Sequence, residues 1–334
     1  VLMSASTSAQ LTIAERLSDA GYATGAFVGA FPVDSMFGLA QGFDVYDDSY
    51  EGEQDGFSLR MVERRADEVA ASARAWIESV EGPWFAWVHV YDPHAPYAPP
   101  APFDAMENPY AGEVAWTDSA LAPLLREARA RDAIVVVTSD HGEAFGAHGE
   151  ETHGVFAYAA TLRVPLIVAG LPDAPVGEVV AARVSHVDLV PTLLAAIGEP
   201  TDDARLQGRS LYPLMHGEAY PEPFDAYFEA LTPYLDWGWA PLRGVYEGDL
   251  KYIDLPIPEI YDVAADPAEL DNLADRRATD LLRLSQRLDA HLEGATAAAD
   301  RVAEDEATLE RLRALGYMGS SGAGPDGDEE FGPE

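Results

Sequence analysis

The sequence predicts an α/β fold, in which helices sandwich a mainly parallel sheet and a small antiparallel subdomain follows at the C-terminal end. Strand-like and helix-like segments alternate over residues 1–217. The strand-like segments of this region are continuous apolar runs, which are typical of strands buried on both faces. After residue 217, shorter strand-like pieces follow one another with Trp, Tyr and Pro between them. This change of pattern indicates a second kind of sheet.

The elements of residues 1–217 can be assigned one by one. A first helix ends at Gly21. The run WFAWVHV is too short and too apolar for a surface helix, and AIVVVT is rich in the β-branched residues that favour strands. The expected strands cover residues 23–28, 84–90, 133–138 and 165–169, and the expected helices cover residues 11–20, 58–80, 114–130 and 185–197. Together they predict an α/β core over residues 1–217.

Residues 218–318 are expected to form the C-terminal subdomain, and residues 319–334 an acidic tail. The tail is rich in Gly, Asp, Glu and Pro, a composition typical of disorder. In the subdomain, we expect a small antiparallel sheet with strands at residues 225–229, 243–246 and 250–253, and helices at residues 278–292 and 304–315.

Composition excludes several kinds of partner. The net charge of −37 repels nucleic acid and anionic membrane surfaces. No apolar run approaches the roughly 20 residues that a membrane-spanning helix needs. An anionic substrate would need local positive charge, for which a metal ion is a natural source. Because cysteine is absent, disulfides, zinc–thiolate sites and cysteine nucleophiles are excluded within these residues.

The strongest chemical signal is the sequence TSDHGE, which directly follows the strand-like run AIVVVT. Ligands of open α/β sheets lie beyond the carboxyl ends of strands, where Asp140 and His141 are expected. A carboxylate beside an imidazole suits a divalent metal ion, although Asp140 could instead cap a turn or helix. His148 and His153 follow closely, so three of the eight histidines fall in one loop. This clustering favours a functional site.

His94 provides a second signal. It follows the strand expected at residues 84–90 and has prolines on both sides, which stiffen the loop. An imidazole held there suits an acid or an anion-binding group, and the alternative is an ordinary proline turn. His89 lies inside the apolar run and is interpreted as a core histidine.

The segments SDHGE, HG and LRVPLIV, together with FAWVHVYDPHAPYAPP, resemble the sulfatase family of the alkaline-phosphatase-like superfamily. Weaker similarities extend in order from residue 11 to residue 319. The resemblance implies that Asp140 and His141 are metal ligands and that His94 and His153 are catalytic groups that contact the ester. Many sulfatases have Asn at the position of His141, whereas His is more like relatives that act on phosphate or phosphonate esters. The implied cofactor is Ca²⁺, with Mn²⁺ or Zn²⁺ as the alternatives that an imidazole ligand favours.

The resemblance implies a metal-dependent hydrolase of sulfate esters, acting on a small-molecule or saccharide sulfate ester. Two alternatives stay open. One is a phosphodiesterase, phosphonate hydrolase or phospho-group transferase of the same superfamily, acting on a phosphate ester. The other is a non-catalytic binding relative. The family's nucleophile is formylglycine, and we expect it in a segment that precedes these residues, so that this chain is an N-terminally truncated fragment, inactive alone. Relatives are often exported, but the sequence does not specify a location.

Overall fold

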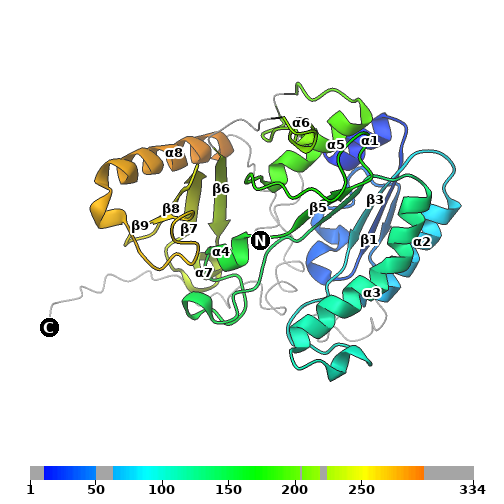
Figure 1. Ribbon diagram of the computed structural model, residues 1–334, viewed down its shortest axis with the longest axis horizontal. Coiled ribbons are helices and arrows are strands. Elements are labelled where there is room, and N and C mark those ends of the chain that lie inside the picture. Colours follow the sequence, from blue (N-terminus) through cyan, green and yellow to red (C-terminus); the bar gives the residue numbers. More distant parts are fainter. Residues whose placement is uncertain (1–10, 50–62, 204, 219–223, 297–334) are drawn as a thin grey trace.

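The computed structural model describes residues 11–49, 63–203, 205–218 and 224–296. Figure 1 shows two lobes, one built around strands β1 and β3 and the other around strands β6 to β9. The helix expected at residues 304–315, the expected tail and the start of the helix expected at residues 58–80 lie outside the described residues.

The first lobe contains the predicted parallel sheet. Its strands β1 (Ala23–Val28), β2 (Val45–Asp47) and β3 (Trp84–His89) are parallel and lie in the order β2-β1-β3. The short strand β2 was not predicted. Val28 pairs with His89, so the carboxyl ends of β1 and β3 lie side by side.

Helices complete this lobe. Thr12 and Glu15 form a capping box at the start of α1 (Ile13–Asp19), and α1 packs against β1. Helices α2 (Ala66–Ser79) and α3 (Pro109–Ala130) pack against each other, and α2 also covers the sheet. The core between them is formed by Phe27, Val69, Ala70, Ala73, Ile77 and Leu124. Strands β1 and β3 are therefore backed by an apolar core.

Strands β4 (Val135–Thr138) and β5 (Leu166–Ala169) depart from the prediction. They form a separate antiparallel pair, and within the described residues neither pairs with β1, β2 or β3. A parallel return needs a long crossover, usually a helix. Here the connection runs as an irregular loop to the other lobe and returns through a single helical turn, α4 (Ala159–Leu162). The chain therefore reverses direction instead of crossing over.

The second lobe is the predicted antiparallel sheet, with strands in the order β6-β7-β8-β9: Asp225–Ala230, Leu242–Glu247, Leu250–Asp254 and Glu259–Asp262. The fourth strand, β9, was not predicted. Helix α8 (Ala278–Thr296) covers one face, where Leu284 and Leu288 contact a core that includes Val245. On the other face Phe228 packs against Ala157, a residue of the loop between β4 and β5. This contact joins the two lobes.

The remaining elements are short. They are the helices α5 (Leu189–Ile197), α6 (Tyr212–Met215) and α7 (Thr232–Trp237), and the 3-10 turns Phe31–Val33, Ser35–Phe37, Phe103–Ala105, Ala147–Gly149, His186–Asp188 and Ala274–Arg276. Among the described residues, no helix combines the length and the apolar character that crossing a membrane requires. The α/β fold class is confirmed, whereas the domain boundary after residue 217 stays a prediction.

Candidate active site

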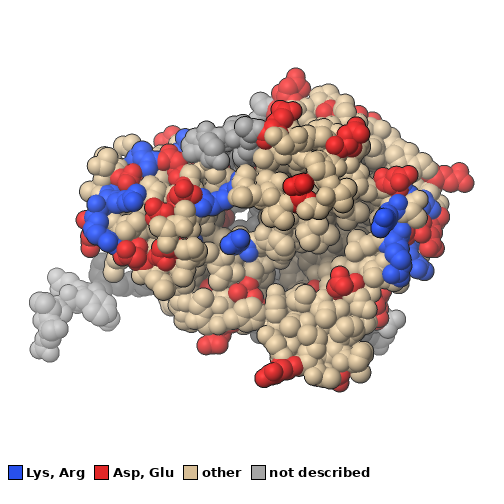
Figure 2. All heavy atoms as spheres, in the orientation of Figure 1, with Lys and Arg blue, Asp and Glu red and all other residues tan. Residues whose placement is uncertain are grey.

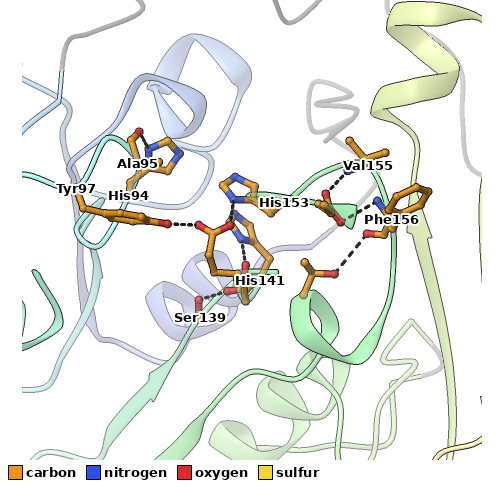
Figure 3. A network of polar contacts seen from close by, with 12 residues as sticks. His94, Ala95, Tyr97, Ser139, His141, His153, Val155 and Phe156 are labelled. Atoms are coloured by element: carbon orange, nitrogen blue, oxygen red, sulfur yellow. Dashed lines mark hydrogen bonds and ion pairs between the residues drawn. The ribbon is translucent and has the colours of Figure 1, made fainter. Parts of the chain in front are cut away.

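Two loops bring the predicted histidines together. One follows β3 and carries His94, and the other follows β4 and carries His141 and His153. The rings of His141 and His153 are stacked, with centroids 4.0 Å apart and planes at 29°. The His94 ring meets the edge of the His153 ring at 5.5 Å. Figure 3 shows the His153 ring between those of His141 and His94, although these residues come from segments almost 60 residues apart (residues 94 and 153).

Glu113 fixes the loop that carries His94. This buried carboxylate projects from α3 and accepts hydrogen bonds from the backbone N–H groups of His94 (3.1 Å) and Ala98 (2.6 Å). The imidazole Nδ1 of His94 lies 2.7 Å from the carbonyl oxygen of Ala95, which can only accept, so Nδ1 carries a proton. The other nitrogen, Nε2, lies 3.0 Å from the hydroxyl of Tyr91. His94 is therefore held at both ring nitrogens, with Nδ1 donating to the Ala95 carbonyl and Nε2 able to accept from the Tyr91 hydroxyl.

His141 is oriented in the same way. Its Nδ1 lies 2.9 Å from the carbonyl oxygen of Gly142, so this nitrogen donates, and in the neutral ring the lone pair lies on Nε2. Nε2 lies 3.6 Å from Oδ2 of Asp140, whose carboxylate is mostly exposed. One imidazole nitrogen and one carboxylate oxygen at this separation fit neighbouring positions around a divalent cation.

Asp140 and His141 could hold a metal ion only together with further ligands. Within the described residues, no group of three or more His, Asp or Glu side chains is arranged to hold a metal. Asp140 and His141 would supply two positions, and further ligands would have to come from elsewhere.

Glu143 links the two loops through hydrogen bonds to Tyr97 and His153. Its Oε2 accepts a hydrogen bond from the hydroxyl of Tyr97 at 2.7 Å, and its Oε1 lies 3.4 Å from Nδ1 of His153. Burial, followed by the proximity of Glu143, raises the pKa of Tyr97, so its phenol stays protonated and donates. Burial is also the largest cause of the lowered pKa of His153, and the neighbouring His141 lowers it further. Both effects favour a neutral His153.

Gly142 is required by the close approach of two chain segments. Its N–H donates to the carbonyl of Thr161 at 2.8 Å, and a Cβ at this position would lie 2.2 Å from the carbonyl oxygen of Ala160. Only glycine allows the SDHG turn to lie directly against α4, which places His141 beside His153.

The other histidines that sequence analysis weighed lie outside this cluster. His89 lies within β3, and burial lowers its pKa. His148 stacks on Tyr158 at 3.6 Å, and its Nε2 lies 3.0 Å from the carbonyl oxygen of Ala268 in the second lobe. His148 is thus an anchor of the loop and not a member of the site.

The sequence prediction missed three polar residues of the site: Tyr97, Glu113 and Glu143. Glu143 is part of the SDHGE motif, and Tyr97 lies beside His94 in the proline-rich loop. The signal for Glu113 was weaker, namely a carboxylate on the face of α3 that also carries Thr117 and Ala120, both buried.

Comparison with known proteins decides the family. The model of the sulfatase family matches residues 3–199, and a model described as the C-terminal part of N-sulphoglucosamine sulphohydrolase matches residues 152–297. The chain belongs to the sulfatase family. The resemblance found in the sequence is therefore confirmed.

Curated sulfatases are similar over about half of the chain. A choline-sulfatase of Rhizobium meliloti (strain 1021) is 30% identical over 174 residues, which is 50% of this chain and 32% of the relative. A Δ4,5-hexuronate-2-O-sulfatase of Bacteroides thetaiotaomicron is 30% identical over 166 residues, 47% of this chain and 34% of the relative. The chain thus spans about a third of the length of the curated sulfatases that it matches.

Solved structures show the same fold at lower identity. A phosphonate monoester hydrolase of Agrobacterium radiobacter superposes with a TM-score of 0.67 and 19% identity, covering 85% of this chain and 80% of that one. BT4656, solved in complex with its substrate D-glucosamine-2-N,6-O-disulfate, superposes with a TM-score of 0.67 and 19% identity. The match covers 88% of this chain and 84% of that one. A phosphonate monoester hydrolase and a protein whose substrate is a disulfated sugar therefore share this architecture.

Proposed function

We propose that this chain forms part of a metal-dependent hydrolase of sulfate esters. The observation that carries the proposal is the meeting of His94, His141 and His153 where the loops after β3 and β4 converge. Family membership supports the reaction type. Asp140 and His141 would hold the cation, for which Ca²⁺ is our first choice and Mn²⁺ or Zn²⁺ the alternatives. When bound, it would supply positive charge beside the ester anion.

The surface gives a reason why such a charge is needed. On the face shown in Figure 2, acidic side chains are spread over both lobes, whereas most basic side chains gather at the outer ends. With a net charge of −37, the chain repels an anionic ester at long range. Attraction must therefore arise within the site itself.

His94 and His153 would supply the protons. With Nδ1 of His94 bound to the Ala95 carbonyl, Nε2 is the nitrogen that would pass a proton to the leaving oxygen, which would have to replace the Tyr91 hydroxyl as its hydrogen-bond partner. His153 directs Nδ1 toward Glu143, so its Nε2 is the nitrogen available to the ester. An anionic ester close to His153 favours its doubly protonated form, in which Nε2 donates to a non-bridging oxygen. The family's nucleophile is formylglycine, and we assign none of these 334 residues to that role.

The proposed substrates are small-molecule or saccharide sulfate esters. The relatives named above include a choline-sulfatase and a hexuronate sulfatase, which span both kinds. A second candidate is hydrolysis of phosphonate or phosphate esters, which is favoured by the imidazole of His141 as a metal ligand. A non-catalytic relative would have the same geometry without turnover.

Hydrolysis of p-nitrophenyl sulfate and phenylphosphonate esters by the full-length protein, with Ca²⁺, Mn²⁺ or Zn²⁺ added, distinguishes these candidates. We expect sulfate ester hydrolysis, and we expect Asp140→Ala to lower kcat/KM by at least about 100-fold, the upper range for disturbing even the groups that support a metal ligand. Asp118→Ala, which removes an exposed carboxylate from α3, is the matched control. Undiminished activity in Asp140→Ala would remove this residue from the mechanism. Turnover of the phosphonate ester alone would favour the second candidate, and no turnover would favour the binding relative.

A further inference from the structure

Lys251 is the only lysine of the chain, and it is completely buried in the second lobe. Its ammonium donates to Oε1 of Glu269 at 2.7 Å and to the carbonyl oxygen of Ala157 at 2.5 Å. The rings of Phe228, Tyr246 and Tyr158 surround the ammonium, with centroids at 5.0, 5.6 and 5.4 Å. An ammonium in this setting is held by directional bonds and by the faces of aromatic rings.

Glu269 completes the arrangement. Its carboxylate is 1% exposed, and Oε2 accepts the backbone N–H of Ala159 at 2.6 Å. The backbone of Glu269 has φ = 57°, an uncommon conformation for a residue other than glycine. Such a conformation persists where the surroundings over-determine it. Here the ion pair and the bond to Ala159 supply that restraint.

Together, Lys251 and Glu269 form hydrogen bonds to both ends of one short stretch of backbone, from the carbonyl of Ala157 to the N–H of Ala159. This stretch begins four residues after His153 (157 against 153). The two residues before this stretch are held as well, because the backbone N–H groups of Val155 and Phe156 donate to the carboxylate of Glu150 at 2.7 and 3.2 Å. The segment after His153 is therefore restrained along its length.

A buried ion pair contributes little stability compared with apolar residues of similar volume, because both charges lose their hydration. What an apolar pair cannot supply is a donor for the Ala157 carbonyl and an acceptor for the Ala159 amide. We propose that Lys251 and Glu269 are positioning residues, which act through the backbone of residues 157–159 to hold the imidazole of His153 against His141. This inference rests on the proposed function for its catalytic consequence, but its structural part can be tested without turnover.

The test uses Lys251→Met/Glu269→Gln in the full-length protein. Met has nearly the length of Lys, and the Gln carbonyl still accepts from Ala159, so the cavity stays filled while the charges and the bond to Ala157 are lost. The control is Arg16→Met/Asp203→Asn, which removes a partly buried ion pair between α1 and a distant loop. Hydrogen exchange is measured by mass spectrometry on peptides that cover residues 153–162 and the helices α1 and α2.

We expect exchange over residues 153–162 to become at least about tenfold faster in the Lys251 and Glu269 variant, with α1 and α2 unchanged, and no such local change in the control. Equal acceleration in all peptides would overturn the proposal, because the pair would then support the fold as a whole. Unchanged exchange over residues 153–162 would overturn it as well.

Kinetics test whether the effect passes through His153. When His153 is intact, Lys251→Met/Glu269→Gln should lower kcat for p-nitrophenyl sulfate about tenfold and change KM by less than about twofold. In a His153→Gln background, the same double variant should change kcat by less than about twofold. Additive losses would contradict a positioning role. If the parent protein hydrolyses no ester, the proposed function fails, and the exchange measurement still decides whether Lys251 and Glu269 restrain this segment.

Discussion

Glu113 provides the sharpest test of how the His94 loop is held. Replacing it with alanine leaves the backbone N–H groups of His94 and Ala98 without their acceptor. An unsatisfied buried donor costs about 1–3 kcal/mol. Both bonds are only partly buried, so water can replace part of the lost bonding, and Glu113→Ala should lower the free energy of unfolding by about 1–3 kcal/mol in total. Glu113→Gln keeps one acceptor oxygen and the side-chain volume, so its loss should fall between that of alanine and zero.

Urea unfolding at pH 7, followed by circular dichroism, measures these losses. Glu127→Ala is the matched control, because Glu127 lies on the same helix and forms a partly exposed ion pair with Arg131 at 2.9 Å. Removing such a pair should cost less than about 1 kcal/mol. If Glu113→Ala and Glu127→Ala are equally stable, the carboxylate of Glu113 does not hold the loop, and the reasoning is wrong.

Two further predictions concern the other site loop and the edge of the parallel sheet. Gly142→Ala should lower the free energy of unfolding by about 1–3 kcal/mol, the usual cost of overpacking, because its Cβ would meet the Ala160 carbonyl at 2.2 Å. Urea unfolding measures this loss, and a wild-type midpoint would show that the two segments separate without cost. Burial raises the pKa of Asp47, but hydrogen bonds from Ser72 and Arg64 lower it more, so it lies below 3.8 in the folded protein. Its contribution to stability is present above pH 3.8 and is lost as the pH falls through the folded value. Asp47→Asn should therefore be less stable than wild type at pH 7 and show a smaller loss between pH 7 and pH 3, and parallel pH profiles would contradict this.

The sequence was sufficient to predict those strands and helices that correspond to a single apolar segment. The strand expected at residues 23–28 coincides with β1, and the one expected at residues 84–90 differs from β3 by a single residue. For the helix expected at residues 114–130, the observed helix α3 begins at Pro109, with Asn108 as its N-cap. This Asn-Pro signal was readable in the sequence and places the start of the helix five residues earlier.

The direction of β5 was not predictable from a local pattern. Its apolar residues fit a parallel or an antiparallel strand equally well. In the structure, Phe156, Tyr158 and Leu162 of the connection pack on the core of the second lobe, and β5 then runs antiparallel to β4. Long-range contacts of this kind leave no periodicity in the sequence.

For the site, strand ends and family resemblance identified His94, His141 and His153, and the structure brings these three together. Their roles stay predictions. Glu113 was not identified, because its function depends on two backbone amides that carry no sequence signal of their own. Supporting groups of this type emerge only when the loops are placed in space.

The burial of the single lysine has a practical consequence for chemical labelling. Amine-reactive dyes and crosslinkers require an accessible ammonium, and Lys251 has none of its surface exposed. In the folded state, these 334 residues should therefore offer such reagents no side-chain target. Once the second lobe opens, Lys251 becomes reactive. Modification of the Lys251 side chain thus reports the unfolding of one lobe without any engineered probe.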